Sequence, residues 1–178
     1  TTNETWDCAT DPVVNSSADV RAPGITTLRD AVQTACAAST ITFDPSLSSP
    51  SGTITLQSEL VIDKHLKIQG PGPSKLTITV DPSVDARMFT VEPGATLELT
   101  GLKLEKEPDA GAFAIQQGGA IFSHNANLIV RECEFWHNAA TEGGAIAVLV
   151  DSDVASSTSI VASVFSENRA EYGGAIWT

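Results

Sequence analysis

Long apolar runs and basic residues are both scarce in this chain of 178 residues. The longest candidate for an apolar run, Ala145 to Val150, is far shorter than the roughly 18 residues that a membrane-spanning helix needs. Only 10 Lys and Arg residues stand against 22 Asp and Glu residues, which gives a formal net charge of −12. An acidic surface repels the phosphate backbone of nucleic acids. We therefore expect neither a transmembrane segment nor a nucleic-acid partner.

Charge of either sign is also low, since charged residues make up 18% of the chain and hydrophobic residues 42%. This composition suits exposed strands joined by polar turns, and the length suits one domain with its own core. The acidic residues are scattered rather than grouped, which argues against a disordered acidic tail. The chain begins at Thr1 without a Met or a signal segment, so we interpret it as processed or excerpted from a larger protein.

One tetrapeptide, Gly-Gly-Ala-Ile, is present three times, at 118–121, 143–146 and 173–176. The second and third copies follow a Phe-x-x-Asn segment, at 135–138 and 165–168. The unit Phe-x-x-Asn-x4-Gly-Gly-Ala-Ile therefore recurs with a period of 30 residues. A fixed period of this length is typical of solenoids, in which every coil must bend at the same place as its neighbour.

Each part of the repeated unit has a physical role in a stack of coils. A glycine pair permits positive φ and lets neighbouring backbones approach closely. The Phe side chains should stack in the interior, and the Asn amides should bond from coil to coil. The alternative, coincidental hairpin turns in a β-sandwich, leaves the fixed offset unexplained. The predicted structural positions are Gly118, Gly119, Phe135, Asn138, Gly143, Gly144, Phe165, Asn168, Gly173 and Gly174.

The pattern before the repeats predicts two parts. Residues 1–40 should form an irregular leader and a short helix, capped by Thr26 or Thr27 and continuing to about Ala38. Because the end of a β-helix exposes strand edges and apolar interior, we expect this helix to cover the first coil. From residue 41 to 178, short alternating runs predict about five coils of parallel β-helix.

Two stretches interrupt the regular spacing of these coils. Glu105 to Gln117 precedes the first glycine pair, and Val150 to Ser159 lengthens the connection between the last two coils. Insertions in solenoids collect in loops, which often form the binding face.

The glycine and Phe-x-x-Asn motifs together resemble the repeats of the chlamydial polymorphic outer membrane proteins over residues 118–178. That resemblance implies a right-handed parallel β-helix displayed outside the cell as an adhesin. The N-terminal part resembles secreted β-helix proteins that open with Cys-Ser-Leu-Arg-Glu-Ala. The matching segments are Thr26–Val32, Ile41–Phe43 and Leu66–Gly72, with Thr26 in place of the first Cys. The predicted fold class is thus an all-β, right-handed parallel β-helix with a short N-terminal capping helix.

Three cysteines have different predicted roles. Cys8 and Cys36 both flank the expected cap, where a disulfide would fasten the leader to the helix, by about 3–4 kcal/mol in the chain-entropy picture. The alternative is three free thiols in a reducing compartment. Cys133 lies two residues before Phe135 in an expected strand, so both side chains should point inward and Cys133 should act as a small apolar filler.

Several residues are candidate surface sites. Asn3 and Asn15 begin N-x-[ST] triplets, which are candidate glycosylation sites if the source is eukaryotic. Trp136 follows an inward Phe and should therefore point outward, as an exposed aromatic contact residue does. Tyr172 and Trp177 are the other candidate contacts, and the alternative for each ring is simple packing over a corner.

An enzyme that acts on polysaccharides is the alternative function, because such β-helices need convergent carboxylates and a base, or a Ca²⁺ site. Asp151 and Asp153 stand close together, but no following residues complete a ligand loop, so a solvated turn is favoured. His124 and His137 lack Cys or Asp partners at metal-ligand spacing, and each is expected at the surface beside a turn. We therefore predict no catalytic residues, no metal and no cofactor, unless acids from successive coils converge with a Lys or Arg.

The predicted function is a structural or adhesive β-helix module, extracellular or at the cell surface, within a larger surface protein or filament. Flat ladders of side chains on such a coil stack can meet a protein, a glycan or another protomer. Thr178 follows the third glycine motif in mid-coil, where strand edges would meet water. We expect further chain, or a second protomer docked end to end, to cover that end.

Overall fold

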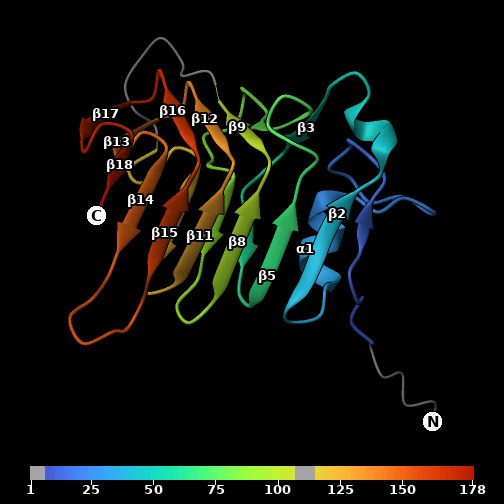
Figure 1. Cartoon of the computed structure of the whole chain (residues 1–178), viewed down its shortest axis with the longest axis horizontal. Helices are drawn as coiled ribbons and strands as arrows, with labels where there is room; N and C mark the ends of the chain where they lie inside the picture. Colours follow the sequence, from blue (N-terminus) through green and yellow to red (C-terminus); the bar gives the residue numbers. More distant parts are fainter. Residues whose placement is uncertain (1–6, 107–114) are drawn as a thin grey trace.

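A computed structural model describes residues 7–106 and 115–178. It contains about five turns of parallel strands that stack along the long axis of the molecule, from the blue N-terminal end to the red C-terminal end of Figure 1. The arrangement confirms the predicted all-β parallel β-helix, and it includes a short α-helix near its N-terminal end.

Three parallel sheets surround the interior, and each coil contributes one strand to each sheet. We call them sheet 1, sheet 2 and sheet 3. Sheet 1 contains β1 Val13–Val14, β2 Ser39–Phe43, β5 His65–Gln69, β8 Thr96–Thr100, β11 Asn127–Arg131 and β15 Thr158–Val161. Sheet 2 contains β4 Leu60–Ile62, β7 Phe89–Val91, β10 Ile121–His124, β14 Ile146–Leu149 and β18 Ile176–Trp177. Sheet 3 contains β3 Gly52–Leu56, β6 Leu76–Val80, β9 Lys103–Glu105, β12 Glu134–Trp136 and β16 Val164–Ser166.

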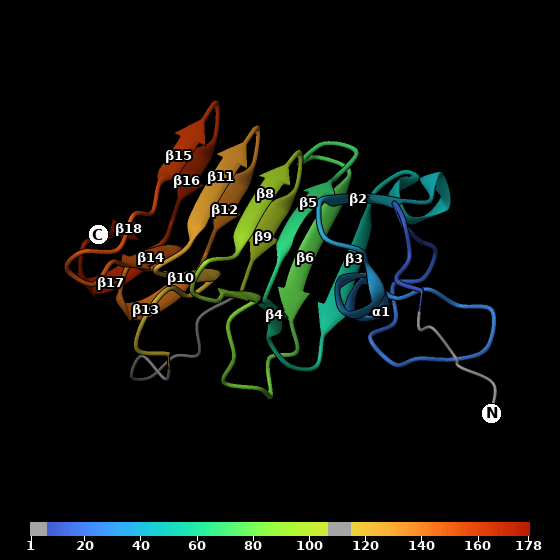
Figure 2. The same cartoon turned by 90° about the horizontal axis from the view of Figure 1, so that it is seen from below.

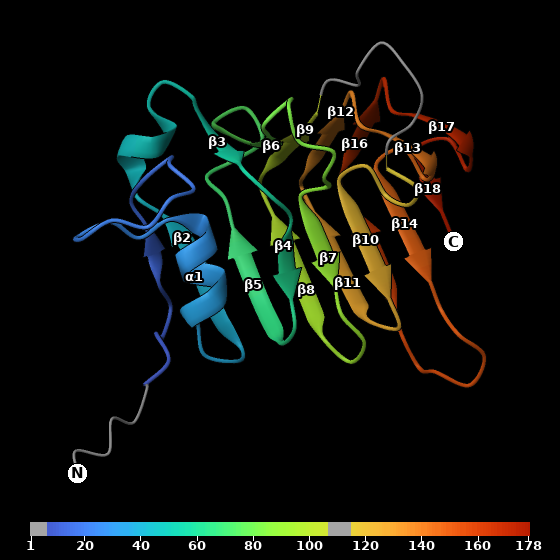
Figure 3. The ribbon, with the colours of Figure 1, turned by 180° about the vertical axis from the view of Figure 1, so that it is seen from behind.

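The chain passes through sheet 1, sheet 3 and sheet 2 in turn before it returns to sheet 1 (Figures 1 and 3). Strands of successive coils pair in parallel without a change of inward face, as in Ile54↔Ile78 and Phe135↔Phe165. A shift of one residue would turn every apolar side chain of a strand outward, so the alternation fixes this register.

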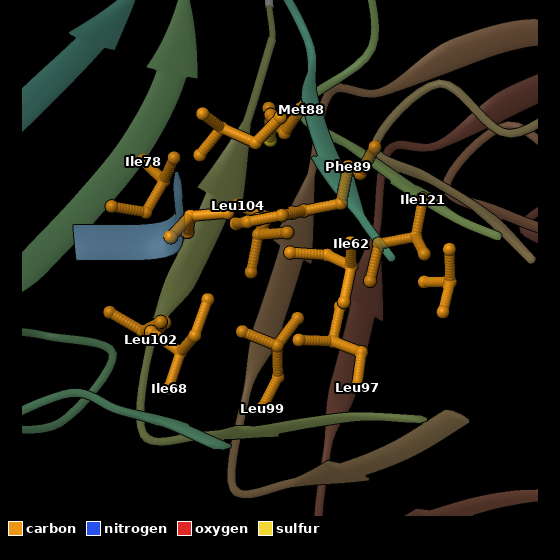
Figure 4. Packing of buried hydrophobic residues seen from close by; sticks show 14 of the residues in the cluster. Ile62, Ile68, Ile78, Met88, Phe89, Leu97, Leu99, Leu102, Leu104 and Ile121 are labelled. Carbon is orange, nitrogen blue, oxygen red and sulfur yellow. The ribbon is translucent and has the colours of Figure 1, made fainter. Parts of the chain in front are cut away.

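Alternate side chains of all three sheets fill a continuous apolar core (Figure 4). One column runs through sheet 3 from coil to coil, and it changes from aliphatic to aromatic side chains along the axis. Its members, in order, are Ile54, Ile78, Leu104, Phe135 and Phe165. The first four are fully buried, whereas Phe165 is partly buried.

The helix α1, Leu28–Thr34, lies at the N-terminal end of the stack beside β2 (Figures 2 and 3). Thr27 caps it, because its side-chain oxygen accepts from the backbone N–H of Asp30 at 3.0 Å while the Asp30 carboxylate accepts from the Thr27 N–H at 3.2 Å. Leu28, Ala31 and Val32 turn a buried face toward the first coil. The helix therefore covers apolar interior, as a cap must.

The helix is shorter than predicted and does not continue to Ala38. Ala35 has an extended ψ of 141° and forms a parallel bridge with Ala9. The Cys36 N–H then donates to the Ala9 carbonyl oxygen at 2.9 Å. Pairing with the leader thus ends the helix one turn early, and the leader is more regular than expected.

Further elements escape the sequence pattern. β1 pairs the leader with β2 through Val13↔Thr42. A short 3-10 helix, η1 Pro45–Ser48, follows β2. β13 Ala139–Glu142 and β17 Arg169–Tyr172 form a fourth, two-stranded sheet just before the second and third glycine motifs. These polar or very short segments have too few inward apolar residues to be recognised as strands.

The turn from sheet 1 to sheet 3 is made by a left-handed residue in three successive coils. Gly101, Glu132 and Ala162 stack there with φ of 64°, 52° and 51°. Positive φ costs an ordinary side chain about 1–2 kcal/mol, so glycine is the residue expected at such a corner. Only Gly101 meets that expectation, and Glu132 and Ala162 give no sign of a corner in the sequence. The hydrogen bonds of the flanking strands hold the backbone in this conformation.

Candidate functional site

The two glycines serve different purposes at the first two repeated corners. Gly118 and Gly143 have φ of 58° and 60°, the left-handed region that favours glycine. Gly119 and Gly144 instead lie where the next coil passes, and a Cβ on Gly144 would be 2.6 Å from the Arg169 carbonyl oxygen. The corner therefore needs one glycine for its conformation and one for the approach of the neighbouring backbone.

The third corner departs from this division. Gly173 and Gly174 both have positive φ, of 77° and 59°. A Cβ on Gly174 would have no heavy atom within 4 Å, unlike one on Gly144. At this corner both positions favour glycine because of their positive φ. Close approach of a neighbouring coil is not the reason for glycine at either position.

The Phe and Asn positions of the repeat join the last two coils. The rings of Phe135 and Phe165 stack with centroids 4.7 Å apart and planes 3° apart. The Asn138 side-chain nitrogen donates to Asn168 Oδ1 at 3.0 Å and to the Leu104 carbonyl oxygen at 3.0 Å. These contacts join successive coils to one another. The Phe and Asn residues of the repeat therefore have a structural role.

Convergent chemistry appears instead on the outer face of sheet 3. Lys103 Nζ lies 2.8 Å from Glu105 Oε2 and 4.0 Å from Glu134 Oε1. The same ammonium lies 3.9 Å from the ring centroid of Trp136, whose ring stacks on His137 at 4.0 Å. We call these five residues the Lys103 cluster. Two carboxylates from successive coils thus meet one lysine, which the sequence reasoning missed.

This cluster revises two expectations. Trp136 does point outward from the strand that buries Phe135, but Lys103 and His137 both lie against its ring, so the side chain is only partly exposed. His137 is likewise packed against an aromatic ring rather than free at the surface. Of the three candidate contact aromatics, Tyr172 is the most open, with 61% of its surface exposed, while Trp177 is partly buried.

A groove of about 340 Å³ lies beside the Lys103 cluster on the same face. Four threonines form its floor in two aligned pairs, Thr53↔Thr77 and Thr55↔Thr79. Glu105 and Lys106 lie at its side, so the groove and the cluster share Glu105. Strand alternation places these hydroxyls outward, and a ligand rich in hydroxyl groups can exchange hydrogen bonds with them.

A second polar cluster joins the long loop after β14 to β10. Asp151 Oδ2 accepts from Asn125 Nδ2 at 2.7 Å and lies 3.2 Å from His124 Nε2. These hydrogen bonds lower the pKa of the Asp151 carboxyl below its ordinary value, with the Asn125 bond contributing most. His124 therefore has an acidic partner after all, from the adjacent coil rather than from nearby sequence. Asp151 is exposed at a turn, as expected, and its hydrogen bonds also anchor the loop.

The predicted disulfide between Cys8 and Cys36, at the N-terminal end, is confirmed. Cys133 is a free and buried thiol, and burial raises its pKa. Within residues 7–106 and 115–178, no group of three or more His, Cys, Asp and Glu side chains is arranged to hold a metal ion.

The candidate glycosylation sites lie in the leader. Asn15 is exposed, and its side-chain oxygen accepts from the Thr26 N–H at 2.8 Å, which leaves the amide nitrogen without a bond to the described residues. Asn3 lies outside the described residues. Glycosylation of either residue stays a prediction.

Residues 162–178 match the family model of the Chlamydia polymorphic membrane protein repeat. The last coil resembles a polymorphic membrane protein repeat. This match contains Phe165, Asn168 and the third glycine motif, and it confirms the resemblance in the last coil of the predicted range 118–178. No curated protein and no solved structure matches the chain. The resemblance of the N-terminal part to the second family stays a prediction.

The polymorphic membrane protein match and the solenoid fold together describe a β-helix module that carries a surface-protein repeat. No helix in the described part of the chain has the length and hydrophobicity to cross a membrane.

Proposed function

We propose that this chain is an extracellular or cell-surface module with a structural and adhesive role, within a larger surface protein or filament. The match to a polymorphic membrane protein repeat supports the surface location. The Cys8–Cys36 disulfide supports an oxidising compartment, because disulfides rarely persist in a reducing cytosol. The division into a leader with cap, residues 1–40, and a coil region, residues 41–178, belongs to the same proposal.

The observation that carries the adhesive role is the outer face of sheet 3. Five parallel strands in register present a continuous ladder of outward side chains along the solenoid axis. The ladder begins with the threonine groove and continues into the Lys103 cluster. A rigid face requires little ordering when it binds, so much of its contact energy is available for affinity. A protein or a glycan at a surface is the proposed partner.

Binding of the purified chain to cultured cells and to a glycan array tests this proposal. Thr79→Lys would place a bulky cation in the groove of sheet 3, and Thr40→Lys is the matched control on the outer face of sheet 1. We expect Thr79→Lys to reduce binding at least about tenfold and Thr40→Lys to leave it unchanged. Equal binding by both variants and the unchanged chain would remove sheet 3 as the adhesive face.

Glycan cleavage is the second candidate function, and the Lys103 cluster is the observation that favours it. Glycosidases use two carboxyl groups across the scissile bond, and Glu105 and Glu134 come from successive coils. Both carboxylates are paired with the same ammonium, however, which favours a structural ion cluster over an acid and a base. Release of reducing ends from polysaccharides, lost in Glu105→Gln and Glu134→Gln, would establish the enzyme instead of the adhesin.

A further inference from the structure

A hollow of about 500 Å³ lies on the outer side of sheet 2, next to β7 and β10. This volume is within the range of about 300–1,000 Å³ that is usual for small-molecule sites. Its lining includes one cation, two acids, two amides and a hydroxyl, namely Arg87, Glu59, Asp85, Gln116, Gln117 and Ser58. The aromatic ring of Phe122 completes the wall. The hollow is separate from the face of sheet 3.

Arg87 has an unusual environment in this hollow. Its side chain is only 19% exposed, yet it forms no hydrogen bond with any described residue. Its contacts are an ion pair, with Nε 3.8 Å from Glu59 Oε2, and a cation–π contact, with Cζ 5.0 Å from the ring centroid of Phe122. Burial lowers the pKa of Arg87, an effect that Glu59 opposes, but a guanidinium remains protonated at physiological pH.

Arg29 provides an internal comparison, because its side chain is 22% exposed and therefore similarly buried. Its guanidinium donates to both oxygens of Asp19, at 3.0 and 2.8 Å. It also donates to the carbonyl oxygens of Glu59 and Ser58, at 3.0 and 2.7 Å. Arg29 is thus saturated with acceptors, as physical chemistry requires of a buried cation.

The N–H donors of Arg87 are the groups that a ligand could engage, because none of them has a hydrogen-bond acceptor among the described residues. An aromatic ring contacts the flat face of a guanidinium, whereas the N–H donors lie in its plane and match a carboxylate through two parallel hydrogen bonds. The acids Glu59 and Asp85 in the same lining can only accept hydrogen bonds when ionised. A fitting ligand therefore carries one carboxylate together with several hydroxyl donors.

We propose that this hollow binds an acidic monosaccharide unit of a glycan, with the sugar carboxylate on Arg87. The sugar hydroxyls then donate to Asp85 and to Glu59, whose Oε2 also accepts from Thr90 Oγ1 at 2.8 Å. Gln116 offers a further amide, and Gln117 offers its remaining donor and its oxygen, since its Nε2 already donates to Glu142 Oε2 at 2.9 Å. An acidic peptide is the poorer fit, because it brings carboxylates to two acids without hydroxyls to satisfy them. The inference rests on the proposed surface function, since a surface-displayed module is the one that meets glycans.

Calorimetric and ligand-observed NMR titrations of the purified chain test the proposal. Glucuronic acid and N-acetylneuraminic acid represent the two common sources of an acidic sugar. Glucose lacks the carboxylate, acetate lacks the hydroxyls, and a short aspartate peptide represents the acidic peptide. We expect at least one acidic sugar to bind at least about tenfold more tightly than glucose, acetate and the peptide, because the paired hydrogen bonds to a guanidinium are strong.

Variants locate the binding. Arg87→Gln should abolish it and Arg87→Lys should weaken it at least about tenfold, since lysine keeps the charge but not the fork of donors. Arg131→Gln, which removes an exposed cation paired with Glu98 on sheet 1, should leave it unchanged. Thermal melting and circular dichroism establish that each variant is folded. If Arg87→Gln does not fold, Gln116→Ala and Gln117→Ala replace it, and each should weaken binding of the acidic sugar.

Three outcomes would overturn the proposal: no binding of either acidic sugar, equal binding of glucose or acetate, or undiminished binding in folded Arg87 variants. Tighter binding of the aspartate peptide would identify a peptide site in place of a sugar site. None of these results bears on surface location or on cell binding through sheet 3, which the Thr79→Lys and Thr40→Lys pair tests separately.

Discussion

The first coils and the last coils of this solenoid reach the same register with different side chains. Sheet 3 is lined inside by Ile54, Ile78 and Leu104 in the first coils, and by Phe135 and Phe165 in the last two. The aliphatic coils lack the Phe-x-x-Asn motif, and among them only the coil of Leu104 carries a glycine motif, at 118–121. The aromatic coils carry both motifs and add the Asn138–Asn168 bond. Alternation of apolar side chains that point inward is therefore sufficient for the coils to stack. The Phe-x-x-Asn and glycine motif adds further contacts to coils that already stack.

The corners support the same conclusion. Gly70 in the first part has no repeated neighbours, yet a Cβ there would be 2.3 Å from the Gly101 carbonyl oxygen of the next coil. It has the same steric function as Gly144, whose Cβ would be 2.6 Å from the Arg169 carbonyl oxygen. Close approach of coils therefore selects glycine in both parts, but a recognisable repeated sequence begins only in the coil of Leu104, at Gly118.

The largest expected effect comes from filling the space between coils. Gly144→Ala should lower the free energy of unfolding by about 4 kcal/mol, because backbone of the next coil must move. Gly174→Ala is the matched control, since it meets no atom within 4 Å and involves only the strain of positive φ. We expect it to cost about 1–2 kcal/mol. Urea unfolding measures both changes.

Gly70→Ala extends this test to the first coils. If close approach acts alike in both parts, its cost should be similar to that of Gly144→Ala. A much smaller cost for Gly70→Ala would break the comparison and give the repeated motif a special role.

Truncation of the aromatic column should have the next largest effect. Phe135→Ala should cost about 3–5 kcal/mol, as usual for a fully buried ring. Phe165→Ala should cost about half as much because that ring is only partly buried. Leu104→Ala, in the adjacent aliphatic coil, should cost about 2–5 kcal/mol. Chemical denaturation would contradict the burial argument if Phe165→Ala proved the most damaging of the three.

Removal of the disulfide should act on the first part alone. Cys8 and Cys36 are 28 residues apart, so a Cys8→Ser, Cys36→Ser double variant should lose about 3–4 kcal/mol in the chain-entropy model. Hydrogen exchange should accelerate in β1 and α1 before it does in β12 and β16. Cys133→Ala is the control that leaves the bridge intact, and uniform acceleration along the whole chain would show that the two parts unfold as one.

The smallest effect should come from the loop anchor of the last part. Because the folded-state pKa of Asp151 is lowered, its stabilisation is present above the unfolded value of about 4 and is lost as the pH falls through the folded value. Asp151→Asn should therefore lower the melting temperature slightly at pH 7 and not at pH 2. Asp153→Asn, two residues along the same loop, is the control. If Asp151→Asn lowered the melting temperature equally at both pH values, the negative charge of Asp151 would not be the source of the stabilisation.

Much of the fold was predictable, because period-two alternation and a 30-residue repeat depend on local sequence. The limits of α1 were not, since pairing of Ala35 with Ala9 overrides the helical pattern. Contacts between coils were the least predictable part. Lys103 and Glu134 meet only because their coils stack in that register. The convergence at Arg87 likewise depends on the stacking of successive coils, which brings Glu59, Arg87 and Phe122 together from distant parts of the sequence.

The one-dimensional stacking also determines how the molecule responds to tension. Each coil is hydrogen-bonded only to its neighbours, so a pull on the chain detaches coils one after another from an end. A coil of 30 residues, the offset between Glu134 and Val164, lengthens the chain by about 100 Å when extended. The Cys8–Cys36 disulfide prevents the chain between these two cysteines from being extended. Such a chain lengthens under load in steps of nearly equal size, and each released step limits the force on the coils that remain.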